Sequence, residues 1–318
     1  MGDKSGIQWT NATWNPLTGC TKVSPGCSSC YAERVEHRYK RDMRPWAVAA
    51  AKGGRGVTLH EDRLSQPMKW TRPRMIFVNS MSDLFHWEVP DWFIVETFGV
   101  MAVTPRHTYQ VLTKRPDRMA DMLENKDFWH DVVDKAAGLT DGRWGQLVTN
   151  DWEVKKGYYL ANLAVGTSVE NQYWANARLP ELARIRAAWR FVSIEPLLGP
   201  VAIKPWLARR LPPSESVPDP AMPAQEAWLN PVLDWVIVGG ESGGTERRRL
   251  VERADALSSA KWVPKPRALE WVRDIRDECV EYRVPFFFKQ WGGPTPTSGG
   301  RELDGREWSE MPEGMQRV

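Results

Sequence analysis

The chain is short of cysteine, of net charge and of long apolar stretches. It has four cysteines among 318 residues and a formal net charge of +3. So few cysteines exclude a disulfide scaffold and are typical of a reducing compartment, so we expect a cytoplasmic protein. No run approaches the roughly 18 apolar residues of a membrane helix, and no apolar stretch follows Met1 as in a signal peptide. We therefore expect no membrane partner, and the small charge does not by itself indicate nucleic-acid binding.

The cysteines that are present lie close together. Cys20, Cys27 and Cys30 fall within eleven residues, whereas Cys279 is far along the chain and is expected to be a buried helix residue. Three thiolates at C-x6-C-x2-C spacing can bind one metal centre but cannot pair completely as disulfides. Two centres suit them: a 4Fe-4S cluster with one open iron, or a zinc ion with His37 as fourth ligand. The pattern favours iron–sulfur, because no second C-x2-C pair is present.

Apolar runs recur at intervals and predict the fold. Continuous runs of this length are typical of strands buried on both faces of a parallel sheet. The clearest lie at 75–79, 108–113, 161–166, 190–194, 234–238 and 285–289, after a first strand within 12–18. Helix patterns lie at 31–39, 91–103, 117–123, 171–188 and 267–282. This alternation predicts an α/β protein, a partial or complete βα (TIM-like) barrel of about six to seven parallel strands with irregular insertions.

The same pattern predicts the domain organisation. The barrel is expected over residues 1–291, with the cysteines in the loop after its first strand. Irregular insertions are expected at about 126–159 and at 204–231, and the second of these is rich in proline. Residues 292–318 are expected to form a C-terminal tail that wraps against the barrel.

Polar residues follow nearly every predicted strand, where the active sites of βα barrels lie. They are Ser80, Ser82 and Asp83 in the second loop, Lys114 in the third, Ser168 and Glu170 in the fourth, Glu195 in the fifth, Glu241 in the sixth, and Lys289 and Gln290 in the last. Glu195 and Glu241 are suited to acid–base catalysis or to binding an ammonium group. They are equally suited to forming salt bridges with arginines. Lys114 and the adjacent Arg115 suit a phosphate or a carboxylate.

Two further features leave alternatives open. The chain has 18 tryptophans, which suit a buried core or platforms on which bases stack. The run of three arginines at 247–249 suits a solvated face or part of a nucleic-acid footprint.

A cysteine triad directly after the first strand of a βα barrel resembles the radical S-adenosylmethionine superfamily. The usual motif there is C-x3-C-x2-C, and this chain differs in the first gap and in having Tyr31 after the last cysteine. Six segments more narrowly resemble a phage and prophage family that has an N-terminal three-cysteine motif and no settled function. They are IQWTNATWNP (7–16), GCSSCYAE (26–33), LTKRP (112–116), SIEPL (193–197), VGGESG (238–243) and FKQWG (288–292).

The resemblance implies a chemistry. Cys20, Cys27 and Cys30 would hold a 4Fe-4S cluster that binds S-adenosylmethionine, and an electron from a donor such as flavodoxin or ferredoxin would generate a 5′-deoxyadenosyl radical. We expect the radical to act on a nucleic acid or nucleotide, in repair or modification. The alternative is a non-catalytic, zinc-stapled phage-type binding protein. A third possibility is an iron–sulfur protein that never cleaves the cofactor.

The resemblance also implies roles for the loop residues. Ser80, Ser82 and Asp83 would contact the methionine amino group of the cofactor. Ser168, Glu170 and Glu195 would serve its ribose or carboxylate. The groups expected to face the substrate as catalytic residues are Lys114, Glu195, Glu241 and Lys289, together with Gln290.

Overall fold

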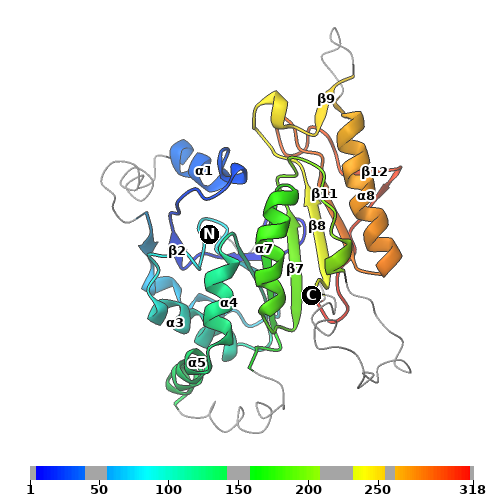
Figure 1. Cartoon of the computed structure of the whole chain (residues 1–318). Helices are drawn as coiled ribbons and strands as arrows, with labels where there is room; N and C mark the ends of the chain where they lie inside the picture. The colour runs from blue at the N-terminus through cyan, green and yellow to red at the C-terminus, as the bar shows by residue number, and fades with distance from the viewer. Residues whose placement is uncertain (1–4, 40–55, 142–157, 208–231, 255–261, 316–318) are drawn as a thin grey trace, which may run out of the picture. The chain divides into compact units, whose positions relative to one another are not determined.

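The computed structural model describes residues 5–39, 56–141, 158–207, 232–254 and 262–315. The chain divides into two compact units. Unit 1 comprises residues 1–167, 180–188 and 315–318, and unit 2 comprises residues 168–179 and 189–314. Figure 1 traces the helices and strands of both units along the chain.

The strands of unit 1 are parallel neighbours in the order β1-β4-β5-β6. They are β1 (Ala12–Trp14), β4 (Met75–Val78), β5 (Thr108–Thr113) and β6 (Leu163–Ser168). Every residue of β4 and of β6 is buried, as expected of strands covered on both faces. Val78 pairs with Trp14 on one side and with Val111 on the other, so the carboxyl ends of these strands lie at one edge.

The strands of unit 2 are also parallel, in the order β7-β8-β11. They are β7 (Trp189–Ile194), β8 (Trp235–Gly239) and β11 (Phe286–Gln290). Val238 pairs with Ile194 and with Phe288, which again aligns the carboxyl ends. All seven strands belong to one parallel sheet, one strand short of a complete eight-stranded barrel. The structure therefore confirms the α/β class and the partial form of the predicted barrel.

The helices begin where proline or a capping side chain favours a start. Pro116 and Pro266 occupy first-turn positions, where the missing N–H of proline costs nothing. In unit 1, α3 packs against α5, and in unit 2, α8 lies along β11 (Figure 1). The α-helices are α1 (Tyr31–Tyr39), α3 (Asp91–Ala102), α4 (Pro116–Glu124), α5 (Lys126–Leu139), α7 (Gln172–Arg184) and α8 (Pro266–Tyr282).

Shorter elements complete the described chain. Three antiparallel pairs are β2 (Leu17–Thr18) with β3 (Thr58–Leu59), β9 (Val251–Arg253) with β10 (Trp262–Pro264), and β12 (Glu302–Leu303) with β13 (Arg306–Glu307). The 3-10 turns are η1 (Pro25–Cys27), η2 (Glu61–Arg63), η3 (Gln66–Lys69), η4 (Lys204–Trp206) and η7 (Glu246–Arg248).

Some predicted boundaries differ from the structure. The first strand, expected over 12–18, divides into β1 and β2 around Pro16, which has no N–H to donate to a strand neighbour. The insertion expected to be irregular at 126–159 begins with α5, whose cap Asn125 accepts a hydrogen bond from the N–H of Asp127. Most of the second insertion lies outside the described residues.

The C-terminal segment packs against unit 2 through its backbone and its tryptophans. Phe288 of β11 donates its N–H to the carbonyl of Trp308 at 2.9 Å, and Trp291 Nε1 donates to the carbonyl of Glu302 at 2.8 Å. Trp14, Trp129, Trp235 and Trp291 are fully buried, which supports a core role for these tryptophans. In the described part of the chain, no helix is long and apolar enough to cross a membrane.

We predict that Gly240→Ala destabilises unit 2. A Cβ atom on Gly240 would overlap the backbone carbonyl of Trp291, and a backbone atom cannot rotate out of the way. Overpacking of this kind typically costs about 1–3 kcal/mol of unfolding free energy. Gly138→Ala is the matched control, because nothing lies near a Cβ there and alanine favours the helix by roughly 0.5 kcal/mol. Urea denaturation of both variants measures the difference, and equal stabilities would contradict the prediction.

Candidate functional site

The three clustered cysteines lie on one segment that follows β1 and β2, here called the cysteine loop (residues 19–30). Cys20 follows Gly19, which bridges to Ser82 in the loop after β4. Cys27 is the last residue of η1, and Cys30 immediately precedes α1. All three are free thiols of intermediate exposure. The cysteine loop thus lies at the carboxyl edge of the sheet of unit 1.

The thiols are close in sequence but are not gathered into a finished ligand set. In the described part of the chain, no three His, Cys, Asp or Glu side chains form a group that could hold a metal ion as placed. The side chain of His37, the proposed fourth zinc ligand, lies outside the described residues. The donor set still fits a thiolate-bound centre in its chemistry, and binding would have to draw the three sulfur atoms together.

A buried ion pair anchors the cysteine loop. Arg115, at the end of β5, donates from Nη1 to Asp83 Oδ2 at 2.8 Å and also contacts Cys20 Sγ at 3.6 Å. Its Nη2 donates to the carbonyl of Thr21 at 3.1 Å and to Thr21 Oγ1 at 3.0 Å. Asp83 and Arg115 are 6% and 9% exposed, so solvent screens the pair weakly. One guanidinium therefore connects three loops of unit 1.

Asp83 is fully engaged within the protein. Its Oδ1 accepts from Thr113 Oγ1 at 2.7 Å and from the N–H of Phe85 at 3.1 Å. Its Oδ2 accepts from the N–H of Lys114 at 3.1 Å as well as from Arg115. The contact with a methionine amino group expected for Asp83 remains a prediction, whereas the structure shows a positioning role.

The two serines of the same loop also bond within the protein. Ser80 Oγ donates to Asn15 Oδ1 at 3.2 Å, and Ser82 Oγ donates to the carbonyl of Leu17 at 3.0 Å. Beside them, Asn79 is 3% exposed, has a left-handed backbone with φ of 62°, and neither atom of its side-chain amide has a hydrogen-bond partner. An unsatisfied buried amide at a strand end is where a polar ligand would be expected. Asn79 was not among the residues expected to contact the cofactor.

Charge and burial set the protonation of the groups around the cysteine loop. Burial, together with the charge of Asp83, raises the pKa of the Cys20 thiol to about 12, although Arg115 acts in the opposite direction. Cys20 is therefore a neutral thiol at pH 7 until a metal displaces its proton. Burial, assisted by the charge of Arg115, lowers the pKa of His86 to about 4. His86 Nδ1 accepts from the N–H of Glu88, so the neutral ring carries its proton on Nε2, which donates to Thr21 Oγ1.

In unit 2, the carboxylates predicted to be functional lie in ion pairs. Lys289 Nζ lies 2.9 Å from Glu195 Oε1, so these two predicted residues meet. Ser193 Oγ donates to Glu195 Oε2 at 3.3 Å. A Cβ on Gly239 would lie 2.5 Å from Glu195 Oε1, so glycine at the end of β8 makes room for this carboxylate.

Glu241 has a different partner. Its two oxygens accept a bidentate pair of hydrogen bonds from Arg248 Nε and Nη2, each at 2.8 Å, and the side chain is 6% exposed. A side chain at Gly244 would overlap this carboxylate. Gln290 donates from Nε2 to Ser242 Oγ at 2.9 Å. Glu241 thus forms a salt bridge with Arg248, which is one of the roles that the sequence left open for it.

Two of the three residues predicted to serve the ribose or carboxylate of the cofactor, Ser168 and Glu170, are buried, whereas Glu195 is half-buried. Glu170 forms an ion pair with Arg178 at 3.2 Å, and the guanidinium also donates to the carbonyl of Ser168 at 2.7 Å. Arg178 stacks on Trp174, with its Cζ 4.1 Å from the ring centroid. These contacts make Ser168 and Glu170 part of the structural frame of unit 2, and their ribose contacts stay a prediction.

The family of the chain follows from a match over almost its whole length. Residues 4–312 match the model of a family described as "Protein of unknown function (DUF5131)". The chain belongs to this family. No curated protein sequence matches the chain.

Solved structures show weaker similarity to this DUF5131 member. A mutant of spore photoproduct lyase aligns with 10% identity and a TM-score of 0.44, over 91% of this chain and 80% of that one. A second mutant, at 11% identity, and the enzyme complexed with dinucleoside spore photoproduct, at 10%, each have a TM-score of 0.41 over 86% of this chain and 74% of theirs. Similarity at this level does not establish a shared function.

We predict strong coupling between Asp83 and Arg115. Arg115→Met leaves a buried carboxylate without its cation and should cost roughly 3–5 kcal/mol of unfolding free energy. Adding Asp83→Asn to that variant should recover part of the loss, because the uncompensated charge is removed. Lys204→Met is the control, since its ion pair with Glu281 is solvent-exposed and its loss should change stability little. A double-mutant cycle by urea denaturation gives the coupling, and strict additivity would refute it.

We predict that His86 makes the metal-free protein less stable in mild acid. Its pKa is about 4 in the folded chain against an ordinary value of 6.5, so between these values only the unfolded chain takes up a proton. The unfolding free energy should therefore fall as the pH drops from 7 to 5. His86→Gln should flatten that dependence in urea titrations. An unchanged slope in the His86 variant would rule out this cause.

Proposed function

We propose that this chain is a radical S-adenosylmethionine-type enzyme with a 4Fe-4S cluster and a nucleic acid or nucleotide as substrate. The observation that carries the proposal is the set of three free cysteines on one short segment at the carboxyl edge of the sheet in unit 1. Zinc sites that are purely structural close four ligands, whereas three thiolates leave a cluster with an open iron.

The proposed cluster ligands are Cys20, Cys27 and Cys30. When bound, such a cluster supplies the electron that cleaves S-adenosylmethionine and yields a 5′-deoxyadenosyl radical. Arg115 would favour the thiolate form of Cys20, because its guanidinium already donates to that sulfur. The buried side-chain amide of Asn79 would form hydrogen bonds with the cofactor. The Asp83–Arg115 pair would hold the surrounding loops in place. In this proposal, an external donor such as flavodoxin or ferredoxin would supply the electron to the cluster.

Unit 2 would contribute groups that hold protons and orient the substrate. Lys289 Nζ pairs with Glu195 Oε1, and a lysine side chain has further N–H groups that can donate to a phosphate or carbonyl oxygen. Glu241 would act through Arg248, which it holds in a fixed bidentate orientation. The residues proposed to face the substrate are Glu195, Glu241 and Lys289 of unit 2 and Lys114 of unit 1.

Exposed aromatic side chains in unit 1 support a nucleic-acid substrate. Trp87 is 66% exposed, Trp92 is 49% exposed and Tyr31, directly after Cys30, is 65% exposed. Bases of a single strand stack on exposed aromatic side chains of this kind. Chemistry on a base also requires that the base leave the stack of a duplex.

Metal analysis tests the proposal directly. Anaerobically reconstituted protein should be brown, absorb near ~400 nm and contain iron and sulfide, and with dithionite it should convert S-adenosylmethionine into 5′-deoxyadenosine. Cys27→Ala should abolish the colour and the product. Cys279→Ala should keep both, because Cys279 is buried in α8.

Two results would contradict the proposal. One equivalent of tightly bound zinc and no iron would favour the zinc-stapled binding protein, with His37 as the fourth ligand to test. An intact cluster that yields no 5′-deoxyadenosine would indicate an iron–sulfur protein without radical chemistry.

A further inference from the structure

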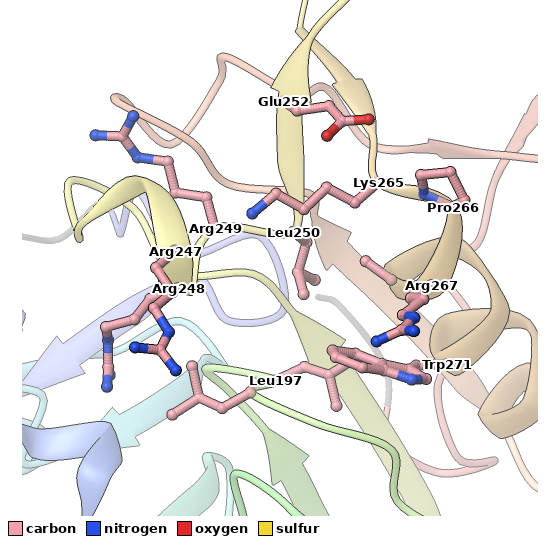
Figure 2. Close-up of a pocket in the computed structure, with 12 residues that line it drawn as sticks. Leu197, Arg247, Arg248, Arg249, Leu250, Glu252, Lys265, Pro266, Arg267 and Trp271 are labelled. Carbon is pink, nitrogen blue, oxygen red and sulfur yellow. The ribbon is translucent and has the colours of Figure 1, made fainter.

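Unit 2 contains a cavity of about 610 Å³. Figure 2 shows its lining, which comes from the segment after β7, the segment between η7 and β9, and the start of α8. Five of the side chains are cationic and one is a carboxylate: Arg247, Arg248, Arg249, Lys265, Arg267 and Glu252. A cavity of this size suits a small ligand, and its charge selects an anionic one.

Of the five cations, two are fixed by hydrogen bonds within the protein, Arg249 lies over the Trp262 ring, and two remain for a ligand. Arg248 is held by Glu241, and Lys265 Nζ donates to the carbonyl of Glu246 at 2.9 Å. Arg247 and Arg267 are exposed, and neither forms an ion pair with another residue that the structure describes. Their guanidinium groups have the planar fork that binds phosphate oxygens in pairs.

The first turn of α8 adds backbone donors. The helix begins at Pro266, which has no N–H, so the N–H groups of Arg267 and Ala268 are the first ones available. The cap residue Lys265 makes no side-chain hydrogen bond to them. Both residues line the cavity, and a helix of 17 residues presents the positive end of its dipole there.

The remaining wall is apolar and partly flat. Trp271, one turn along α8, lies beside Arg267 in Figure 2, and Leu197 and Leu250 face the same space. Inorganic phosphate alone would leave this wall without a partner. A ligand that combines a phosphate with a flat, weakly polar ring satisfies both halves of the cavity.

We propose that this cavity binds a nucleotide unit. Its phosphate lies against Arg267 and the first turn of α8, its base packs against Trp271, and Arg247 adds positive charge from the opposite side of the cavity. Glu252 is then the acceptor for a hydroxyl or amino group of the same ligand. The site lies wholly in unit 2 and requires no metal, so it goes beyond the proposed iron–sulfur chemistry and does not depend on it.

Isothermal titration of the full chain with four probes tests this site. The probes are a nucleoside monophosphate, the matching nucleoside, inorganic phosphate and a 12-nucleotide single strand. The double variant Arg247→Glu, Arg267→Glu should weaken the binding of the monophosphate and the strand at least tenfold. Arg72→Glu is the control, because this exposed residue of unit 1 is outside the cavity and its replacement should leave the affinity unchanged.

Substitutions of Trp271 distinguish the contribution of the base to binding from that of the phosphate. Trp271→Leu should weaken the nucleoside and the monophosphate but leave inorganic phosphate unaffected, and Trp271→Phe should restore most of the loss. Tighter binding of the monophosphate than of the strand identifies a free nucleotide as the source of the ligand, and the reverse order identifies a nucleic acid. Either order supports the site.

Two outcomes would overturn it: no binding of any nucleotide probe, or wild-type affinity in the double arginine variant. Cys27→Ala should bind the probes as the wild type does. Loss of the iron centre and loss of this site can therefore be told apart.

Discussion

The buried pair of Asp83 and Arg115 is the interaction on which the cysteine loop depends. A guanidinium and a carboxylate that are both nearly inaccessible to water interact strongly, and each would destabilise the fold if left alone. Arg115 extends the pair to Thr21 and Cys20, while Asp83 extends it to Thr113 and the backbone of Lys114. The loops after the first, second and third strands are therefore held by one charge pair.

In unit 2, ion pairs also hold the loops after the strands, and glycines make room for their carboxylates. Gly239 leaves room for the Glu195 carboxylate, and Gly244 leaves room for that of Glu241. Each carboxylate then has a single dominant cation, Lys289 or Arg248. The glycine-rich segment after β8 thus leaves space for charged side chains.

The sequence predicted the strands well because their runs are apolar throughout. Met75–Val78 and Leu163–Ser168 are buried at every position, and a continuous apolar run is the direct signature of that environment. It did not predict α5, although Asn125 followed by Asp127 is a recognisable helix start. Among site residues, Glu195 and Lys289 were both selected and do meet. Arg115 was selected to bind a phosphate or a carboxylate and pairs with Asp83, whereas Asn79 was not selected. Their importance comes from burial, which no local pattern encodes.

The sequence by itself determined the cysteine spacing, the succession of strands and helices and the polar residues at the strand ends. These are local properties, fixed by neighbours a few positions away. Only the tertiary structure decided which carboxylate meets which cation, which amide is left without a partner, and that Arg247, Arg267 and Trp271 line one cavity. Those outcomes depend on contacts between residues far apart in the chain, and the packing of the strands and loops decides which of them form.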